Sequence, residues 1–340
     1  MVRILSADAV RDLLSLTELF PVVEEAFVKQ GRGEVERPPR PHFPVGIGVD
    51  DIRDGIDNLG EMGDGVQSNS PLGTALTMPA YIHGRTVYAT KLAAVHPDNT
   101  THGLPTVNAQ VALTDSTTGL PLGFFDGNTI TSARTGCIGG LAAEYLTADP
   151  IRLGVIGAGT QARWQTRAIA TGSDVESVRI YSPSDSREAC AADLRDEGLP
   201  AEAVDSPDEA VADANVVVTA TTSSDPVFDG GLLEPGALVV AVGAYTAEMQ
   251  ELDATTFDRA ARVFADVPEE VADIGDVRAA GLSESDLVPL SEVFEGVVGR
   301  DSDEEILVVE SVGSAVLDAA TAEYLYEKAR ERGVGEDVGL

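Results

Sequence analysis

The chain has 340 residues, of which 23 are lysine or arginine and 57 are aspartate or glutamate, so its formal net charge is -34 and its isoelectric point is near 4.2. A protein this acidic is repelled by nucleic-acid phosphates and by anionic lipid, which argues against both as partners. The carboxylates are spread along the chain, and aromatic residues make up only 5% of it. We interpret this composition as an adaptation to high salt, in which repulsion between the charges is screened.

The remaining composition describes a globular protein. Hydrophobic residues make up 43% of the chain, and its length suits about two domains of roughly 150 residues each. No apolar stretch approaches the ~20 residues that a membrane-spanning helix needs, and the N-terminus lacks a signal-peptide core, so we expect a cytoplasmic protein. Cys137 and Cys190 are too few for a disulfide framework and the four histidines match no zinc spacing, so no metal site is expected.

The first 73 residues divide into a helical part and an irregular part. Apolar residues recur at helical spacing from Leu5 to Val35, and the prolines of ERPPRPHFP end the predicted helix. Residues 45–73 are rich in glycine and aspartate and show weak periodicity. We expect them to form a long excursion or loop.

Residues 74–127 are predicted to form a hairpin-rich sheet. Apolar runs fill 73–82, 85–95 and 106–127, and the turn residues DSTTG divide the last of these in two. The next segment, 128–146, begins with polar residues and contains many small ones. It should form a closely packed helix that leads out of a first domain.

From residue 151 the pattern changes to strands and helices in alternation. Strands are predicted at 151–157, 175–182, 214–221, 236–244 and 261–267, and helices at 160–172 and 185–198. This succession is typical of a parallel α/β sheet. Residues 304–333 are predicted to form a strand, a turn and a long helix.

The segment LGVIGAGTQA carries a glycine pattern directly after a predicted strand and at the start of a predicted helix. Gly157, Gly159 and Ala162 match G-x-G-x-x-A. The first glycine permits a tight turn, the second lets the backbone approach a pyrophosphate, and the small third residue lets helix and strand pack closely. Because it opens a series of alternating elements, the motif predicts a dinucleotide site.

The end of the following strand bears on the choice between NAD and NADP. NAD-binding domains place a carboxylate there to hold the ribose 2'-hydroxyl. This chain reads IYSPSDSRE, with Ser182, Ser184 and Arg187 at or after the strand end. Hydroxyls and a guanidinium suit a 2'-phosphate, so NADP is favoured, although Asp185 leaves NAD open.

Five segments together resemble a known family. TKLAAVHPDN, GLPTVNAQVALTDSTTGLPLGFFDG, TSARTG, IGAGTQA and ESVGSAVLDAA are similar, in this order and over nearly the whole chain, to the ornithine cyclodeaminase and mu-crystallin family. The resemblance implies a homodimer of two-domain α/β subunits. Residues 1–128 and 311–340 would form an α+β substrate-binding and dimerisation domain, and residues 129–310 a Rossmann-type NAD(P)-binding domain.

The resemblance also implies roles for individual residues. Lys91 resembles the catalytic lysine, Arg134 the carboxylate-binding arginine, and Arg40 a second carboxylate clamp, with Arg37 close enough to leave the register open. Val312 would lie near the nicotinamide and the substrate. The implied cofactor contacts beyond the motifs above are Thr106, Thr160, Gln161, Thr219, Thr221, Val242 and Ser311.

Lysine is scarce in this chain, which makes Lys91 informative. The others are Lys29 and Lys328, whereas arginine is used freely. A lysine can donate and take back a proton at a reacting imine or carbonyl group, whereas arginine stays charged. Arginine is the better clamp for a carboxylate, because it makes two parallel hydrogen bonds.

One departure from the family pattern concerns the choice of reaction. Cyclodeaminases of this family carry an aspartate after two glycines to activate water, and this chain has Tyr245 at that position. A tyrosine, with an ordinary pKa of about 10, is a poor base at neutral pH, although it can donate a proton or shape a pocket. Glu248 and Glu251, in the same loop, are interpreted as a solvated helix start.

We therefore predict an NAD(P)-dependent oxidoreductase that acts on the carbon–nitrogen bond of a small amino or imino acid. Family members with such activity are alanine dehydrogenases and reductases of cyclic ketimines such as pyrroline-2-carboxylate. The alternatives are an ornithine cyclodeaminase with bound NAD, and a mu-crystallin-like protein that binds NADP or a small ligand without turnover.

Overall fold

The computed structural model describes residues 1–49, 70–148 and 150–339. The chain divides into two compact units. The first unit comprises Met1–Leu13, Val35–Ile130 and Ala322–Leu340, and the second comprises Leu14–Glu34 and Thr131–Thr321. Most of the excursion predicted at 45–73 lies outside the described residues.

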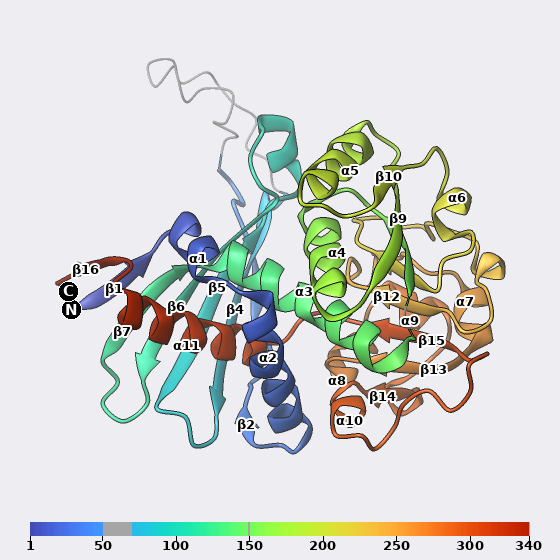
Figure 1. Cartoon of the computed structure of the whole chain (residues 1–340). Coiled ribbons are helices and arrows are strands. Elements are labelled where there is room, and N and C mark those ends of the chain that lie inside the picture. Colours follow the sequence, from blue (N-terminus) through green and yellow to red (C-terminus); the bar gives the residue numbers. More distant parts are fainter. Residues whose placement is uncertain (50–69, 149, 340) are drawn as a thin grey trace, which may run out of the picture. The chain divides into compact units, whose positions relative to one another are not determined.

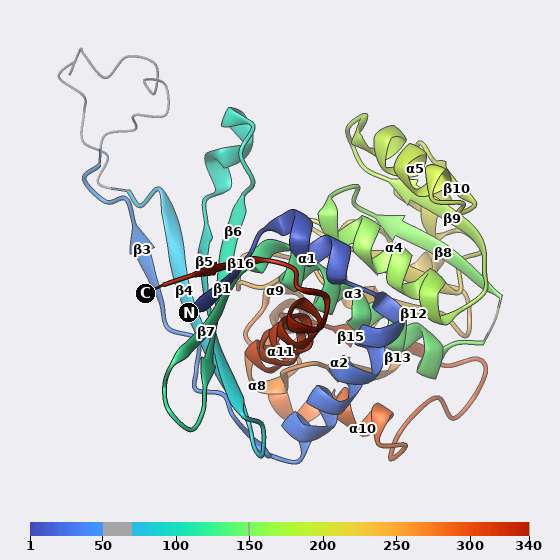
Figure 2. The ribbon, with the colours of Figure 1, turned by 60° about the vertical axis from the view of Figure 1, so that its left-hand side comes forward.

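The first unit is built on a mostly antiparallel eight-stranded sheet, with the order β16-β1-β7-β6-β5-β4-β2 and with β3 paired to β4. Figure 2 shows β1 and β16 side by side, so both chain termini lie at one edge of this sheet. The hairpin prediction is confirmed by the antiparallel pairs β4–β5, β5–β6 and β6–β7. Its elements are β1 (Val2–Leu5), α1 (Ala7–Leu13), β2 (Val35–Glu36), β3 (His42–Val45), β4 (Gly73–Ile82), β5 (Val87–Val95), η2 (Pro97–His102), β6 (Val107–Asp115), β7 (Pro121–Asp126) and β16 (Glu336–Val338).

Strand β5 has two chemically different faces, because successive side chains of a strand point to opposite sides. Val87, Ala89 and Lys91 are buried on one side. Tyr88 and Leu92 lie on the other, with exposed fractions of 36% and 43%. The lysine thus shares its side of the strand with small and apolar residues, while the opposite side keeps large apolar side chains exposed.

The second unit is built on a parallel eight-stranded sheet with the order β10-β9-β8-β11-β12-β15-β13-β14. Its central strands are rich in valine and buried on both faces, as parallel sheets covered by helices require. Figure 1 shows α4 and α5 on one side of the sheet beside β9, and Figure 2 shows them with β8 as well. The predicted α/β class is confirmed.

The elements of the second unit follow in chain order. They are α2 (Leu16–Gly31), β8 (Ile151–Ile156), α4 (Thr160–Gly172), β9 (Val175–Tyr181), α5 (Ser186–Asp196), β10 (Ala201–Ala203), α6 (Pro207–Val211), β11 (Val216–Thr219), η3 (Gly230–Leu232), β12 (Leu238–Ala241), α7 (Ala254–Arg259), β13 (Ala260–Ala265), α8 (Pro268–Val271), α9 (Gly275–Ala279), η4 (Glu284–Asp286), β14 (Leu287–Pro289), α10 (Ser291–Phe294) and β15 (Ile306–Glu310). Two helices have residues in both units, namely α3 (Gly127–Leu146) and α11 (Ala315–Arg332).

The predicted close packing of the helix at 128–146 is confirmed in its second half. A Cβ atom added to Gly136 would lie 2.8 Å from the carbonyl oxygen of Trp164, and one added to Gly140 would lie 2.9 Å from that of Ala168. Both carbonyls belong to α4. The glycines of α3 therefore let the backbones of two helices approach directly, which a larger side chain would prevent.

The single helix predicted from Leu5 to Val35 is wrong. The chain forms strand β1 and then two helices, α1 and α2. The two helices are separate because Ser15, with extended backbone angles of φ -133° and ψ 116°, interrupts the helical backbone and starts α2. Strand β1 is only four residues long and depends on pairing with β7 and β16, which lie far away in sequence. Helix α2 packs in the second unit, where the ring centroids of Phe27 and Phe294 are 5.3 Å apart.

Candidate active site

The glycine turn after β8 has the geometry that a dinucleotide site requires. Gly157 has φ +116°, donates its backbone N–H to the oxygen of Tyr181 at 2.8 Å, and has no room for a Cβ, which would lie 2.5 Å from the Ala220 oxygen. Gly159 caps α4, and a Cβ there would meet no atom within 4 Å. Ala162 is fully buried. The turn is thus closed on its inner side and open where a pyrophosphate would lie.

The first turn of α4 supplies polar groups to this open side. Thr160 is exposed, and the Oε1 atom of Gln161 is buried without a hydrogen-bond partner among the described residues. The backbone N–H groups of a helix's first turn have no partner within the helix and attract anions. The N–H groups and the exposed Thr160 hydroxyl are donors that fit the pyrophosphate of a dinucleotide, whereas the enclosed Oε1 atom of Gln161 is an acceptor and adds nothing to this fit.

The end of β9 carries hydroxyls and an arginine. The Ser182 and Ser184 hydroxyls both contact the hydroxyl of Ser186, at 3.2 Å and 2.7 Å. Arg187 donates from Nη1 to the Ser182 carbonyl at 3.0 Å and from Nη2 to the Asp205 carboxylate at 3.0 Å. Its Nε is buried and has no partner among the described residues. The guanidinium is therefore fixed at the strand end by its two Nη atoms.

A buried glutamate joins the ends of two strands of the parallel sheet. Glu251 is fully buried and accepts hydrogen bonds from the Thr219 hydroxyl at 3.0 Å, the Thr221 N–H at 2.6 Å and the Gly243 N–H at 2.8 Å. Val242 donates its N–H to the Thr219 carbonyl at 3.0 Å. The prediction that Glu251 lies at a solvated helix start is wrong, because its carboxylate is used inside the fold.

The loop after β15 is held by a second buried acid. Asp266 accepts from the Ser311 hydroxyl at 2.7 Å, the Val312 N–H at 3.1 Å and the Gly313 N–H at 2.7 Å. Burial raises the pKa of this carboxyl, and these three hydrogen bonds oppose the increase. Ser311 and Val312, both predicted to face the cofactor, therefore belong to a loop of fixed shape.

Arg134 lies on α3 with its side chain almost completely enclosed. Its Nε donates to Asp318 Oδ1 at 3.0 Å and its Nη1 to the Thr135 hydroxyl at 2.7 Å. Gly313, with φ +78°, leaves room for the guanidinium, because a Cβ there would lie 2.7 Å from Nη2 of Arg134. The arginine thus lies against the loop that Asp266 holds.

Three predicted site residues belong to the first unit. Lys91 is 3% exposed, in the middle of β5, between Met78 of β4 and Val111 of β6. Thr106 is half-buried before β6, where its carbonyl accepts the N–H of His96 at 2.8 Å. Arg40, like Arg37, is half-buried in the segment between β2 and β3.

Tyr245 follows β12 and is 42% exposed. Burial of part of the side chain raises the pKa of the phenol above its ordinary value. A raised pKa means that even less of this tyrosine than of a free one is ionised at neutral pH, so less phenolate is present to act as a base. This side chain is consequently suited to donating a hydrogen bond and not to activating water.

The residues missed by sequence reasoning are three buried acids, namely Glu251, Asp266 and Asp318. Their chemical type gave no signal in a chain with 57 acidic residues. One signal was available for Asp266, because it lies inside the predicted strand 261–267, between the apolar residues Ala265 and Val267. A charged residue there is expected to have a partner.

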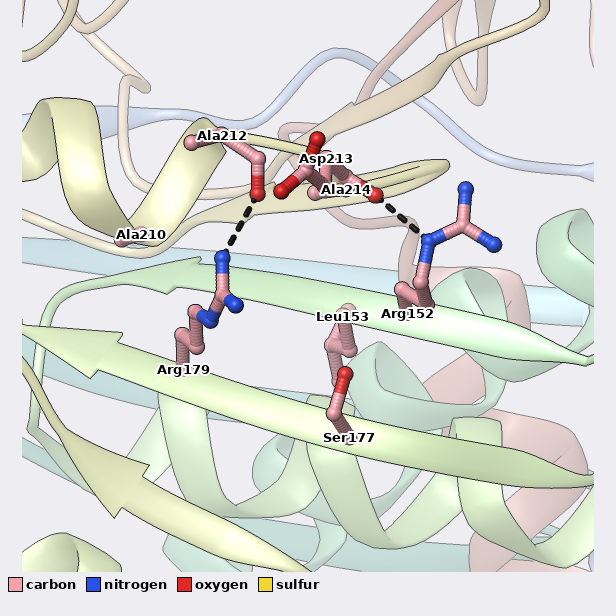
Figure 3. A pocket seen from close by; sticks show the side chains of 8 residues that line it. All are labelled: Arg152, Leu153, Ser177, Arg179, Ala210, Ala212, Asp213 and Ala214. Atoms are coloured by element: carbon pink, nitrogen blue, oxygen red, sulfur yellow. Dashed lines mark hydrogen bonds between the residues drawn. The ribbon is translucent and has the colours of Figure 1, made fainter.

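A small, open hollow lies elsewhere in the second unit. Figure 3 shows it between β8, β9 and the segment after α6, where Arg152 donates to the Asp213 carbonyl at 2.6 Å and Arg179 to the Ala212 carbonyl at 2.9 Å. It lies toward the amino ends of the strands, away from the glycine turn. Among the described residues there is neither a helix long and apolar enough to cross a membrane nor a group of three metal-ligating side chains.

Comparison with known proteins gives close agreement over most of the chain. The ornithine cyclodeaminase/mu-crystallin family matches residues 65–333. The Delta(1)-pyrroline-2-carboxylate reductase of Bacillus cereus is 37% identical over 275 residues, which cover 78% of this chain and 84% of that protein.

Two solved structures match almost end to end. The Thermococcus litoralis Delta(1)-pyrroline-2-carboxylate reductase in complex with NADH and L-proline has a TM-score of 0.88 and 31% identity, covering 99% of this chain and 100% of that one. An archaeal alanine dehydrogenase dimer with bound NAD has a TM-score of 0.85 and 31% identity, covering 99% of each chain. The predicted family is thereby confirmed: the chain belongs to the ornithine cyclodeaminase/mu-crystallin family.

Proposed function

We propose that this protein is an NAD(P)-dependent oxidoreductase that reduces the carbon–nitrogen double bond of a small imino acid, or oxidises the corresponding amino acid. The observation that carries the proposal is the open glycine turn before α4, in a chain whose end-to-end relatives are a pyrroline-2-carboxylate reductase and an alanine dehydrogenase. Cyclic ketimines, and pyruvate with ammonium, are the two substrate classes to test first.

The proposed chemistry divides among a few side chains. Arg134 binds the substrate carboxylate, with Arg40 as a second clamp. When bound, the reduced nicotinamide supplies a hydride to the carbon of the C=N group. Lys91 donates a proton to the nitrogen, so that hydride and proton together convert the imine to an amine. The buried environment of Lys91 favours proton exchange, because it excludes competing water.

Reduction is favoured over hydrolytic deamination because no aspartate occupies position 245. Tyr245 replaces the aspartate of cyclodeaminases, and the pKa of its phenol is raised by burial. Glu251, the nearest buried acid in the sequence, has both oxygens engaged in hydrogen bonds. Neither side chain is arranged to activate a water molecule at the substrate.

For the cofactor, we propose NADPH in preference to NADH. Support comes from Ser182 in place of a carboxylate and from the Arg187 guanidinium, which is fixed at the end of β9. The two solved relatives carry NADH and NAD, so the preference rests on the residues of this chain alone. The other cofactor contacts proposed are Thr106, Thr160, Gln161, Thr219, Thr221, Val242 and Ser311.

The proposal extends to a homodimer in a cytoplasm of high salt concentration. The alanine dehydrogenase relative is a dimer, and the side of β5 opposite Lys91 exposes Tyr88 and Leu92. The domain boundaries at 128/129 and 310/311 remain part of the same proposal. Sedimentation in concentrated potassium chloride measures the subunit number directly.

The reaction is tested by following nicotinamide absorbance in concentrated potassium chloride. NADPH and NADH are offered separately, with pyruvate plus ammonium and with pyrroline-2-carboxylate. We expect oxidation with one substrate class, faster with NADPH, and its loss in Lys91→Ala. Lys29→Ala is the matched control, because Lys29 forms an ion pair with Glu34. Absence of oxidation with every pair, together with ammonia release from ornithine under catalytic NAD, would establish the cyclodeaminase instead.

A further inference from the structure

Glu251 connects two strand ends that are separate in sequence. Its Oε2 accepts from the Thr219 hydroxyl, at the end of β11, and from the Gly243 N–H, two residues after β12. Its Oε1 accepts from the Thr221 N–H. One carboxylate therefore fixes the backbone where both strands leave the sheet.

These strand ends lie at the edge of the sheet where ligands bind in this fold class. In open parallel sheets, dinucleotides occupy the crevice outside the carboxyl ends of the strands. Gly157, in the turn that opens the predicted site, is close to the same segment, since a Cβ on it would lie 2.5 Å from the Ala220 oxygen. The segment that Glu251 holds is thus in contact with the glycine turn.

The local sequence is adapted to this carboxylate. A Cβ on Gly243 would lie 2.6 Å from the Glu251 carboxyl carbon, so only glycine fits there. Asp276 on α9 accepts the N–H groups of Glu251 and Leu252, both at 2.7 Å, and fixes the backbone that carries the glutamate. The carboxylate has little freedom to move away from its donors.

We infer that Glu251 is a positioning residue for the dinucleotide: its carboxylate holds the Thr219–Thr221 and Val242–Gly243 segments in the shape that the cofactor contacts. The inference rests on the proposed use of NAD(P). It predicts that a substitution of Glu251 lowers cofactor affinity and leaves the rates of proton and hydride transfer unchanged.

Ionisation of this group adds a measurable signature. Burial raises the pKa of Glu251 to about 7, and the charge of Asp276 contributes to the increase. The other acids around it are Asp276 itself, with a pKa raised to about 6, and Asp266 and Glu310, whose pKa values burial also raises. Protonation of Glu251 removes an acceptor from its donors, so cofactor affinity should fall as the pH decreases through about 7.

The test uses Glu251→Gln and measures NADH and NADPH binding by energy transfer from Trp164, the chain's single tryptophan, which lies on α4. Glutamine keeps the shape but replaces one acceptor oxygen by a donor. We expect the Kd and KM of the cofactor to rise roughly ten-fold, with kcat at saturating cofactor within about two-fold of the parent. The variant's affinity should not change between about pH 6 and 8, whereas that of the parent should.

Glu248→Gln is the matched control, because Glu248 is an exposed acid of the same loop. An affinity for NADH and NADPH within about two-fold of the parent in folded Glu251→Gln protein would overturn the inference. If that variant does not fold, Glu251→Asp keeps the carboxylate but shortens the side chain away from its donors and must weaken cofactor binding, and unchanged binding overturns the inference equally. Parent protein that binds NADH but reduces no imino acid would refute the proposed reaction while this binding test still stands.

Discussion

A guanidinium that is only 3% exposed needs a charged partner, and Arg134 has one in Asp318, whose side chain is 2% exposed. The pair links α3 to α11. Breaking a buried pair by removing one partner costs about 3–5 kcal/mol, because the remaining charge is left without compensation. We expect Asp318→Ala to lower the free energy of unfolding of the second unit by about 3 kcal/mol, measured by urea denaturation at constant salt.

The control for this prediction is an exposed ion pair in the same chain. Asp8 and Arg11 form one on α1, with side chains 86% and 55% exposed. Asp8→Ala should change the free energy of unfolding by less than about 1 kcal/mol, as exposed pairs do. Equal effects of the two substitutions would mean that Arg134 finds another partner when Asp318 is absent.

At the scale of single residues, sequence reasoning singled out Lys91 and Arg134 as site candidates. Lys91 is informative because the chain has two other lysines, and Arg134 because it belongs to a recognisable motif. Glu251, Asp266 and Asp318 were not predicted. Their roles depend on burial, and burial at a strand end or on a helix face follows from packing that no local pattern records.

At the scale of the element, a substitution in the turn between β8 and α4 can change cofactor binding without changing the stability of the fold. Gly159 has negative φ, and a Cβ on it meets no protein atom within 4 Å. Gly159→Ala should therefore leave the thermal unfolding temperature almost unchanged. It should weaken NADH binding by roughly ten-fold or more, because the methyl group occupies the space that the pyrophosphate needs. Energy transfer from Trp164 measures the binding.

Gly299→Ala is the matched control, since Gly299 also lies in open space without a positive φ and is far from the turn in sequence. It should alter neither binding nor stability. Gly157→Ala should behave differently again, because its φ of +116° and the nearby Ala220 oxygen make any side chain strained even without cofactor. Normal NADH binding by Gly159→Ala protein would show that the pyrophosphate does not approach this turn.

Elements with a long, regular pattern were predicted well. Strands β4 to β9 and helix α3 follow from apolar runs and turn residues, with ends shifted by a few residues. The short strands β1, β10 and β14 were not found, because three or four residues carry too little periodicity. Strand β1 in addition pairs only with β7 and β16, which are distant in sequence. Helix α2 was predicted as helix, but its place in the second unit depends on contacts such as Phe27 with Phe294.

At the scale of the whole molecule, the dominant feature is a formal charge of -34. The charged pairs found among the described residues are mostly arginines with acids, such as Arg163 with Asp193 and Arg167 with Glu197. With 57 acids and 23 basic residues, the acids outnumber the basic residues more than two to one. Their mutual repulsion acts on the folded state more strongly than on the expanded unfolded chain.

We therefore expect the thermal unfolding temperature to rise when potassium chloride increases from about 0.15 M to about 1 M, since the Debye length falls from about 8 Å to about 3 Å. Salt also strengthens the burial of apolar surface, which would raise the unfolding temperature too. A variant with fewer acidic residues distinguishes this cause from the screening of charge repulsion. Asp196→Lys, Glu234→Lys and Glu331→Lys replace exposed acids and reduce the negative charge by two apiece. If repulsion is the cause, the triple variant is more stable at low salt and depends less on salt. If the triple variant depends on salt as strongly as the parent protein, the stabilisation by salt comes from apolar burial. The acidic surface would then serve solubility alone.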